Sequence, residues 1–147
     1  MRDNLRNLQV VHLGNVTLNG TDELKSGWVD LRGFNSCTIM VVANVIADAG
    51  TASGFTARLR DAPSAADAGA ADVAAADTPD GTVDVTSVSD ADDNKILAGL
   101  GYIGGKRFVG VNIIGTTLSD AAISIYAILG RAGRQPTTFV GAVVART

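Results

Sequence analysis

The stretch that decides the fold is Cys37-Thr38-Ile39-Met40-Val41-Val42-Ala43-Asn44-Val45-Ile46-Ala47. Apolar side chains recur in it at every second position, and a β-strand turns such positions to one face because successive side chains point to opposite sides. The pattern predicts a core strand whose buried face consists of Cys37, Ile39, Val41, Ala43, Val45 and Ala47. The only cysteine, Cys37, is expected to be a buried thiol without a disulfide partner in this chain.

Other segments show the same period of two. Phe55-Thr56-Ala57-Arg58-Leu59-Arg60 alternates between apolar and polar residues, which predicts an antiparallel strand with Arg58 and Arg60 on its outer face. Between Ala121 and Leu129 every odd-numbered residue is apolar. This segment is therefore also expected to be a strand, and we expect it to pair with the strand before it.

Two further apolar segments, 95–102 and 107–114, flank Ile103-Gly104-Gly105-Lys106. A Gly-Gly pair supplies the positive φ values of a tight turn, so these segments are predicted to form a hairpin. Several short strands between glycine-rich turns, without a long helical pattern, favour an all-β sandwich or barrel.

The composition favours one folded domain. The 147 residues are 46% hydrophobic with a mean hydropathy of +0.23, far from the composition of disordered chains. We expect a single domain over 1–147, with an N-terminal arm or edge strand at 1–24, a sandwich at 25–130 and a C-terminal tail at 131–147. A secretory leader and a run of 18 apolar residues are both missing from the sequence, so we expect a soluble protein without membrane contact.

Charge is distributed unevenly along the chain. Nine Asp and no Lys or Arg lie from Asp61 to Asp93, so the remaining 12 basic and 6 acidic residues give the rest of the chain a charge of +6. A uniformly basic face for nucleic acid is not expected, although the basic remainder suits an acidic partner surface. Residues 61–94 are predicted to be a long surface connection with two short strands, near 71–75 and 82–87.

Residues suited to catalysis are sparse. His12 is the only histidine, Glu23 the only glutamate, and Cys37 is expected to be buried, so neither enzyme activity nor a cofactor is expected. One His and one Cys cannot complete a zinc site. Gly99-Leu100-Gly101-Tyr102-Ile103-Gly104 matches a dinucleotide motif, but the sequence after it does not predict the helix that the motif requires. Asp90-Ala91-Asp92-Asp93-Asn94 fails the EF-hand pattern; it is interpreted as a solvated turn, with another type of calcium site as the alternative.

Several stretches carry a resemblance to known proteins. They are Trp28-Val29-Asp30-Leu31-Arg32-Gly33-Phe34, the strand through Val45, Phe55–Asp61, Asp92-Asp93-Asn94-Lys95, Leu100–Val109 and Ala127-Ile128-Leu129-Gly130. In their order and spacing they resemble a family of small structural proteins of tailed bacteriophages, the capsid decoration or cement proteins. The resemblance covers about residues 26 to 131.

This resemblance implies an antiparallel, jelly-roll-like β-sandwich without catalysis. It implies a protein that is made in the host cytoplasm and binds the outer surface of the assembled head as a homodimer or homotrimer. The implied partner is the major capsid protein, whose neighbouring subunits it would brace. The Ala- and Asp-rich segment 62–77 and the apolar C-terminal tail depart from the family's pattern, which leaves the oligomer and the contact surface open.

The candidate partner-binding residues are Trp28, Phe139, Val140, Val143 and Val144. Trp28 is the only Trp, and a large aromatic side chain suits an interface anchor, although a core or rim position is its more common role. A sandwich of this size cannot bury an apolar tail and an arm well. Segments 1–20 and 137–147 are therefore expected to mediate self-association or capsid docking, for example by pairing with a neighbouring sheet edge.

Two other function classes stay open. The first is another virion part, such as a tail, neck or fibre-base protein, because similar small β-sandwiches serve many roles. The second is a host-surface or carbohydrate-binding module. The latter would need an exposed aromatic cluster, for which two Tyr and one Trp offer little material.

Overall fold

A computed structural model describes residues 8–47, 54–87, 92–116 and 120–130. These residues form ten β-strands and one short 3-10 turn. Among them there is no helix with the length and apolar character needed to cross a membrane. The elements are β1 (Leu8–Asn19), β2 (Glu23–Lys25), β3 (Val29–Asp30), β4 (Ser36–Ile46), β5 (Phe55–Ala62), β6 (Ala71–Asp72), η2 (Ala75–Asp77), β7 (Asp84–Ser87), β8 (Lys95–Tyr102), β9 (Phe108–Gly115) and β10 (Asp120–Gly130).

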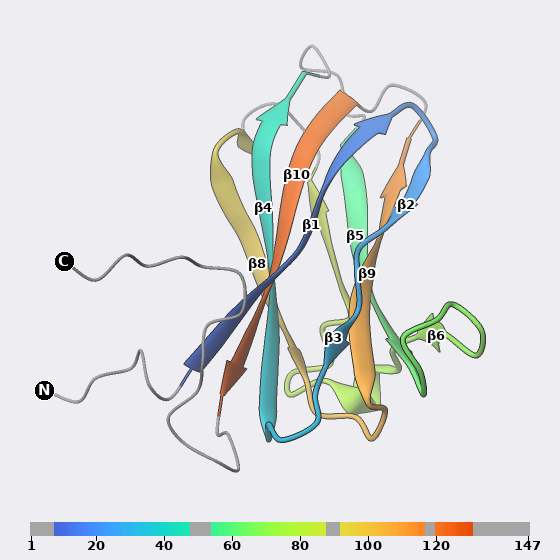
Figure 1. The fold of residues 1–147 in the computed structure, drawn as a ribbon. Helices are drawn as coiled ribbons and strands as arrows, with labels where there is room; N and C mark the ends of the chain where they lie inside the picture. The colour runs from blue at the N-terminus through green and yellow to red at the C-terminus, as the bar shows by residue number, and fades with distance from the viewer. Residues whose placement is uncertain (1–7, 48–53, 88–91, 117–119, 131–147) are drawn as a thin grey trace, which may run out of the picture.

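The strands form two antiparallel sheets that pack against each other (Figure 1). Sheet A has the order β1-β10-β4-β8, and sheet B has the order β2-β9-β5-β6, with β3 also paired to β9 and β7 to β5. Most connections pass from one sheet to the other, so consecutive strands usually lie in different layers. This is the strand order of a double-sheet jelly roll, and it confirms the β-sandwich expected from the sequence.

The core lies between the inner faces of the two sheets. Alternation along each strand turns one apolar set inward, so side chains from β4 and β10 meet those from β5 and β9. Leu, Ile and Val dominate the largest fully buried side chains, and Phe55 is the one aromatic residue among them. Burial of each such side chain contributes about 1.5–3 kcal/mol, so this aliphatic interior is the main source of stability.

Two strands predicted from alternation are confirmed together with their faces. In β5 the three apolar residues of the predicted segment point into the core, and Arg58 and Arg60 lie on the outer face. In β10 every odd-numbered residue from Ala121 to Leu129 is buried. The acidic connection holds β6 and β7, close to the two places where short strands were expected.

The predicted buried face of β4 is wrong at its C-terminal end. Its first four residues are buried as expected, but Val45 is 52% exposed and Ala47 is exposed beyond the end of the strand. The register with β10 skips Asn44, which is an extra residue in β4 and forms a β-bulge. Because one extra residue reverses the alternation, Ile46 takes the buried position instead of Val45.

The predicted hairpin is also wrong. β8 pairs with β4 in sheet A and β9 pairs with β5 in sheet B, so the connection between them crosses from one sheet to the other. Neither Gly104 nor Gly105 has a positive φ. Gly104 meets a different need, because a Cβ atom there would lie 2.5 Å from the hydroxyl oxygen of Tyr102.

The position of β10 differs from the expectation as well. It lies between β1 and β4 in the middle of sheet A, not beside β9. Alternation specifies that a strand has a buried face but not which strand lies next to it, and jelly-roll connections separate consecutive strands. The pairing of β1 with β10 begins at Leu8 and Gly130, so part of the N-terminal segment forms an edge strand of the sandwich.

Candidate functional site

The three residues whose side chains could in principle take part in catalysis, His12, Glu23 and Cys37, lie in three different parts of the molecule. His12 is exposed on the outer side of β1, with its Nε2 3.1 Å from Asn15 Oδ1. Glu23, on sheet B, accepts a hydrogen bond of 2.6 Å from the Asn112 amide. Cys37 is buried in the core, and desolvation raises the pKa of its thiol to about 12, which strongly disfavours the reactive thiolate. The structure therefore does not bring these three side chains together.

The described part of the Asp-rich turn before β8 serves to fix the backbone. Asp93 Oδ1 accepts a hydrogen bond from the Ile46 N–H, and Asp92 Oδ1 lies 3.7 Å from Lys95 Nζ. Within the described ranges, no three His, Cys, Asp or Glu residues are grouped so that they could hold a metal ion. Asp90 lies outside those ranges, so only part of the sequence cluster is placed.

Trp28 lies on the outer side of sheet B, just before β3, and is half-buried. The guanidinium carbon of Arg60 lies 5.4 Å from its ring centroid, within the range of a cation–π contact. The ring also covers Gly110, where a Cβ atom would lie 3.2 Å from it. Trp28 thus packs over its own sheet, whereas the four candidates of the tail, Phe139, Val140, Val143 and Val144, lie outside the described residues.

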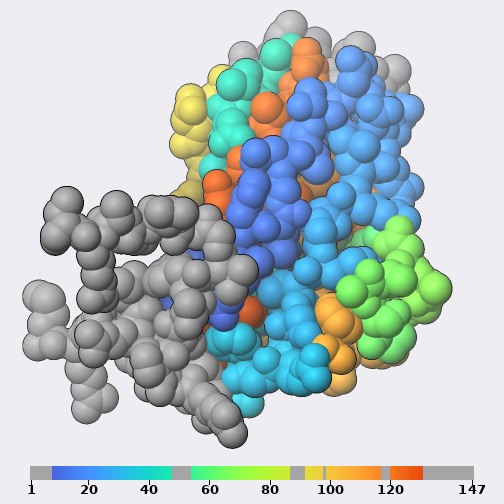
Figure 2. All heavy atoms as spheres, in the orientation of Figure 1, coloured from blue at the N-terminus to red at the C-terminus, as the bar shows by residue number. Residues whose placement is uncertain are grey.

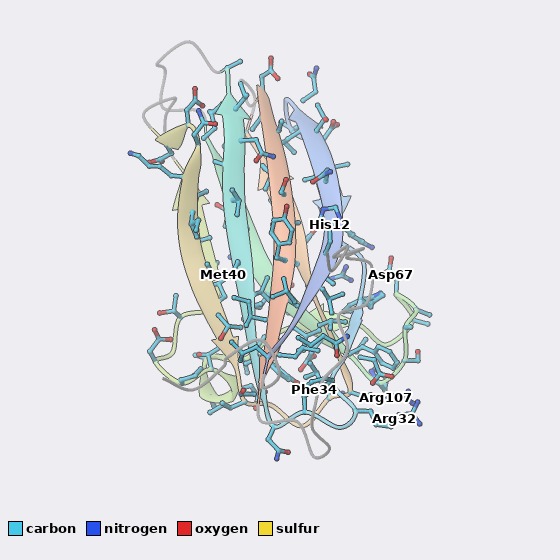
Figure 3. All side chains as sticks on the ribbon, turned by 60° about the vertical axis from the view of Figure 1, so that its left-hand side comes forward. His12, Arg32, Phe34, Met40, Asp67 and Arg107 are labelled. Atoms are coloured by element: carbon cyan, nitrogen blue, oxygen red, sulfur yellow. The ribbon has the colours of Figure 1, made fainter. Side chains whose placement is uncertain are left out.

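A pocket of about 490 Å³ lies at the end of the sandwich where the β3–β4 connection meets the β8–β9 connection. Figure 3 shows three of its lining residues, Arg32, Phe34 and Arg107, gathered at this end. Its apolar and aromatic lining residues are Leu31, Phe34, Cys37, Tyr102 and Ile103, and its cationic residues are Arg32, Lys106 and Arg107. The pocket therefore combines an apolar wall with a positively charged rim.

One carboxylate organises this rim. Arg107 donates to Asp30 through Nε and Nη2, at 2.9 and 2.5 Å, and Arg32 Nη2 lies 3.7 Å from the same carboxylate. The Arg107 hydrogen bond lowers the pKa of Asp30 to about 2, so this carboxylate stays charged. No ion pair joins Lys106 to another described residue. The rim therefore carries three cationic side chains and one carboxylate.

A buried hydrogen bond fixes the base of the pocket. The Tyr102 hydroxyl donates to Asp61 Oδ2 at 2.9 Å and accepts the backbone N–H of Lys106 at 3.0 Å. Burial raises the pKa of Tyr102, which keeps the phenol neutral. Because Tyr102 ends β8 and Asp61 belongs to β5, this bond joins the two sheets beneath the pocket.

Ion pairs cover the outer face of sheet B. Arg58 Nη2 lies 3.0 Å from Asp84 and Nη1 3.5 Å from Asp72, while Arg60 Nη1 lies 3.6 Å from Asp67. The three aspartates belong to the acidic connection, and the arginines belong to β5. Three aspartates of the acidic connection are thus paired with arginines inside the molecule.

The outer face of sheet A has a different composition, and we call it the uncharged face. Its apolar residues are Val10, Met40, Val42, Val45, Ile96 and Ile128, and its polar residues are His12, Asn15, Ser124 and Tyr126. Between the strand ends, the described outward positions hold no Asp, Glu, Lys or Arg. Figure 2 shows the four strands side by side in the upper part of this face, and Figure 3 labels His12 and Met40 on it.

Sequence reasoning missed both the pocket and the uncharged face. The predicted hairpin concealed the pocket, because that pocket forms only when β8 and β9 belong to different sheets. A signal for the face was present in the printed sequence. The positions that alternate with the core set are Thr38, Met40 and Val42 in β4, where a solvated strand such as β5 has arginines.

Comparisons with known proteins give one structural relative. No family model matches this chain, and no curated protein matches it. The fold is similar to the crystal structure of the PBSX exported protein XepA, with a TM-score of 0.52 and 14% sequence identity. The match covers 94% of this chain and 42% of XepA, so the chain spans less than half of its relative's length. At this identity the likeness supports the fold alone.

Proposed function

We propose that this chain is a structural protein of a tailed bacteriophage, which binds the outer surface of the assembled head and braces neighbouring major capsid subunits. The motifs between residues 26 and 131 that resemble decoration proteins support this proposal, as does a fold similar to that of an exported protein of the phage PBSX. The proposal includes no catalysis, no cofactor, no nucleic acid and no membrane contact. It locates the protein on the outside of the virion.

The observation that carries the proposal is the pocket with its apolar wall and cationic rim. Phe34, Tyr102 and Ile103 provide a surface for one apolar side chain, and Lys106 provides a charge that no described ion pair neutralises. An extended capsid segment with an apolar residue beside Asp or Glu matches both features. The chain's own tail fits less well, because residues 131–147 include three Arg and no Asp or Glu.

The ends of the described chain lie beside this pocket. Leu8 pairs with Gly130, and the Gly130 carbonyl accepts a hydrogen bond of 3.3 Å from the N–H of Asn35, which lines the pocket. Leu8 and Gly130, the first and last described residues of the sandwich, therefore lie at the pocket end.

Binding to undecorated heads tests the proposal. In the full chain, Ile103→Ser combined with Lys106→Glu removes an exposed apolar side chain and reverses a rim charge, so co-sedimentation with heads should weaken at least tenfold. The matched control is Lys95→Glu, an exposed lysine at the other end of β8. Wild-type binding should also weaken as salt increases, because the rim contributes through charge.

Three results would contradict the assignment of the pocket. The pocket variant could bind heads as strongly as the wild type, the Lys95→Glu control could lose as much head binding as the pocket variant, or head binding could be independent of salt. A separate full-chain variant, Phe139→Asp with Val143→Asp, tests the tail, and occupancy of heads should fall if the tail contributes to docking. Copy number in purified virions distinguishes the alternative role, since hundreds of copies indicate decoration and a few indicate a tail, neck or fibre-base part.

A further inference from the structure

The uncharged face has the layout of a protein–protein interface. Val45 and Ile96 are 52% and 62% exposed, and both are on the side of sheet A that faces away from the core. Lys95 and Asp120 begin β8 and β10, Asp92 lies 3.7 Å from Lys95, and Asp80 follows Pro79, which lies against Gly101 at the other end of β8. Exposed apolar side chains on a face without charged residues between its strand ends are typical of surfaces that bind another protein.

Four polar side chains of this face are already hydrogen-bonded across the strands. Asn44 Nδ2 donates to Ser124 Oγ at 2.7 Å, and Ser124 Oγ donates to Asn15 Oδ1 at 2.7 Å. His12 Nε2 lies 3.1 Å from the same oxygen, and its ring stacks on Tyr126 with a centroid distance of 5.0 Å. Covering these four side chains therefore breaks few hydrogen bonds to water, so their desolvation costs little.

The absence of charge from the described face indicates which partner fits it. In a two-fold dimer the same patch contacts itself, so a charge near the axis meets its own copy and repels it. Sheet B holds its charges in internal pairs on the opposite side of the molecule, where Asp72 and Asp84 contact Arg58. The acidic connection reaches the outer side of sheet A only where Pro79 lies against Gly101 among the described residues, at the end of β8 opposite to Ile96.

The size of the face limits the strength of such a dimer. Four strands about 4.8 Å apart, with about eight residues each at about 3.3 Å per residue, give a footprint of roughly 500 Å². Two copies would bury about 1,000 Å² in total, near the lower limit for a specific interface. The dimer should therefore dissociate on dilution.

We infer that two copies of this chain associate face to face through the uncharged face of sheet A. This inference does not rest on the capsid role, because the pocket lies at the end of the sandwich and stays open in such a dimer. The dimer would present two pockets, one from each copy, and could contact two capsid subunits at once.

Sedimentation velocity of the full chain over a range of concentrations tests the inference. The wild type should change from monomer to dimer as concentration rises, and Ile96→Lys or Val45→Asp should raise the midpoint concentration at least tenfold. Both residues are exposed, so the variants should keep the wild-type melting temperature. Thr86→Lys, on the exposed outer side of β7 in sheet B, is the matched control and should leave the midpoint unchanged.

The inference would be overturned if the wild type stayed monomeric, if it formed a trimer, or if only Thr86→Lys disrupted the dimer.

Head binding separates this failure from failure of the proposed function. If Ile96→Lys is monomeric and still binds heads, the two surfaces have separate partners as we infer. If the wild type is monomeric and Ile96→Lys loses head binding, the uncharged face contacts the capsid, which overturns the self-association but not the capsid role.

Discussion

The two sheets of this sandwich have similar inner faces and contrasting outer faces. On sheet B, Arg58 and Arg60 point outward and meet aspartates of the acidic connection. On sheet A, the corresponding outward positions of β4 hold Thr38, Met40 and Val42, and no described charged side chain covers them. One face satisfies its charges within the chain, while the other leaves apolar side chains exposed.

This difference indicates which outer face is covered by the chain itself and which one can bind a partner. A segment of the same chain lies on the outer face of sheet B, because Asp67, which precedes β6, contacts both Lys25 of β2 and Arg60 of β5. On sheet A the described part of this connection reaches the outer side at one place, where Pro79 lies against Gly101 near the end of β8, and it leaves Val45 and Ile96 exposed. Contiguous exposed apolar surface is uncommon on soluble monomers and usually marks an interaction site. The following predictions test the contrast, from the largest expected effect to the smallest.

The boundary between the inside and the outside of sheet A can be tested with two neighbours in β4. Ile46→Ala should lower the free energy of unfolding by about 2–5 kcal/mol, because it leaves a cavity in the core. Val45→Ala should change it by less than about 0.5 kcal/mol, because Val45 is outward after the bulge at Asn44. Urea unfolding of the dilute protein measures both. A larger loss of stability for Val45→Ala than for Ile46→Ala would contradict the β-bulge at Asn44.

The bond that joins the two sheets beneath the pocket should have the next largest effect. Tyr102→Phe removes the hydroxyl, which leaves the buried Asp61 carboxylate without this donor and the Lys106 N–H without this acceptor. We expect a loss of about 1–3 kcal/mol in urea unfolding. Tyr126→Phe on the uncharged face is a suitable control, and an equal loss in both variants would contradict the special role of Tyr102.

The two arginines of β5 should differ from each other. The Arg60 side chain is only 11% exposed beneath Trp28 and Asp67, so Arg60→Met should cost about 1–2 kcal/mol. Arg58 is more exposed, and surface ion pairs contribute little, so Arg58→Met should cost less than about 1 kcal/mol. Thermal unfolding in low salt measures the difference. Equal effects would show that Trp28 does not shield Arg60.

Acid should weaken the rim of the pocket by a small amount. The pKa of Asp30 is lowered from an ordinary value of 3.8 to about 2 in the folded chain. Its stabilising effect is therefore present above about pH 4 and is lost as the pH falls towards 2. Arg107→Met should reduce this part of the acid dependence, which melting temperatures between pH 5 and 2 would detect. An unchanged acid profile in the variant would contradict the assigned pair.

Alternation in the sequence was sufficient to predict β5 and β10 with their buried faces, but not which strands lie beside them. The pattern in β5 and β10 is local, and it gave the buried faces correctly. The bulge at Asn44 depends on the register with β10, which no local pattern contains. Gly104 was read as a turn residue, although its lack of a side chain serves the contact with Tyr102, a requirement visible only in three dimensions.

The candidate site was less predictable for the same reason. The pocket requires two connections that are distant in sequence, residues 31–37 and 102–107, to meet at one end of the sandwich. Trp28 was predicted to bind a partner, and the structure places it against Arg60 on sheet B, so its role as an interface anchor stays a prediction. The roles proposed for Phe139, Val140, Val143 and Val144 stay predictions, because these residues lie outside the described ranges.

Cryo-electron microscopy of the intact virion tests the central claim most directly, because it locates each copy and shows which face each partner covers. We predict many copies on the outside of the head, with the pocket end against the major capsid protein and the uncharged faces of two copies in contact. A few copies at the neck or tail, or copies in contact through the ion-paired face of sheet B, would contradict this account.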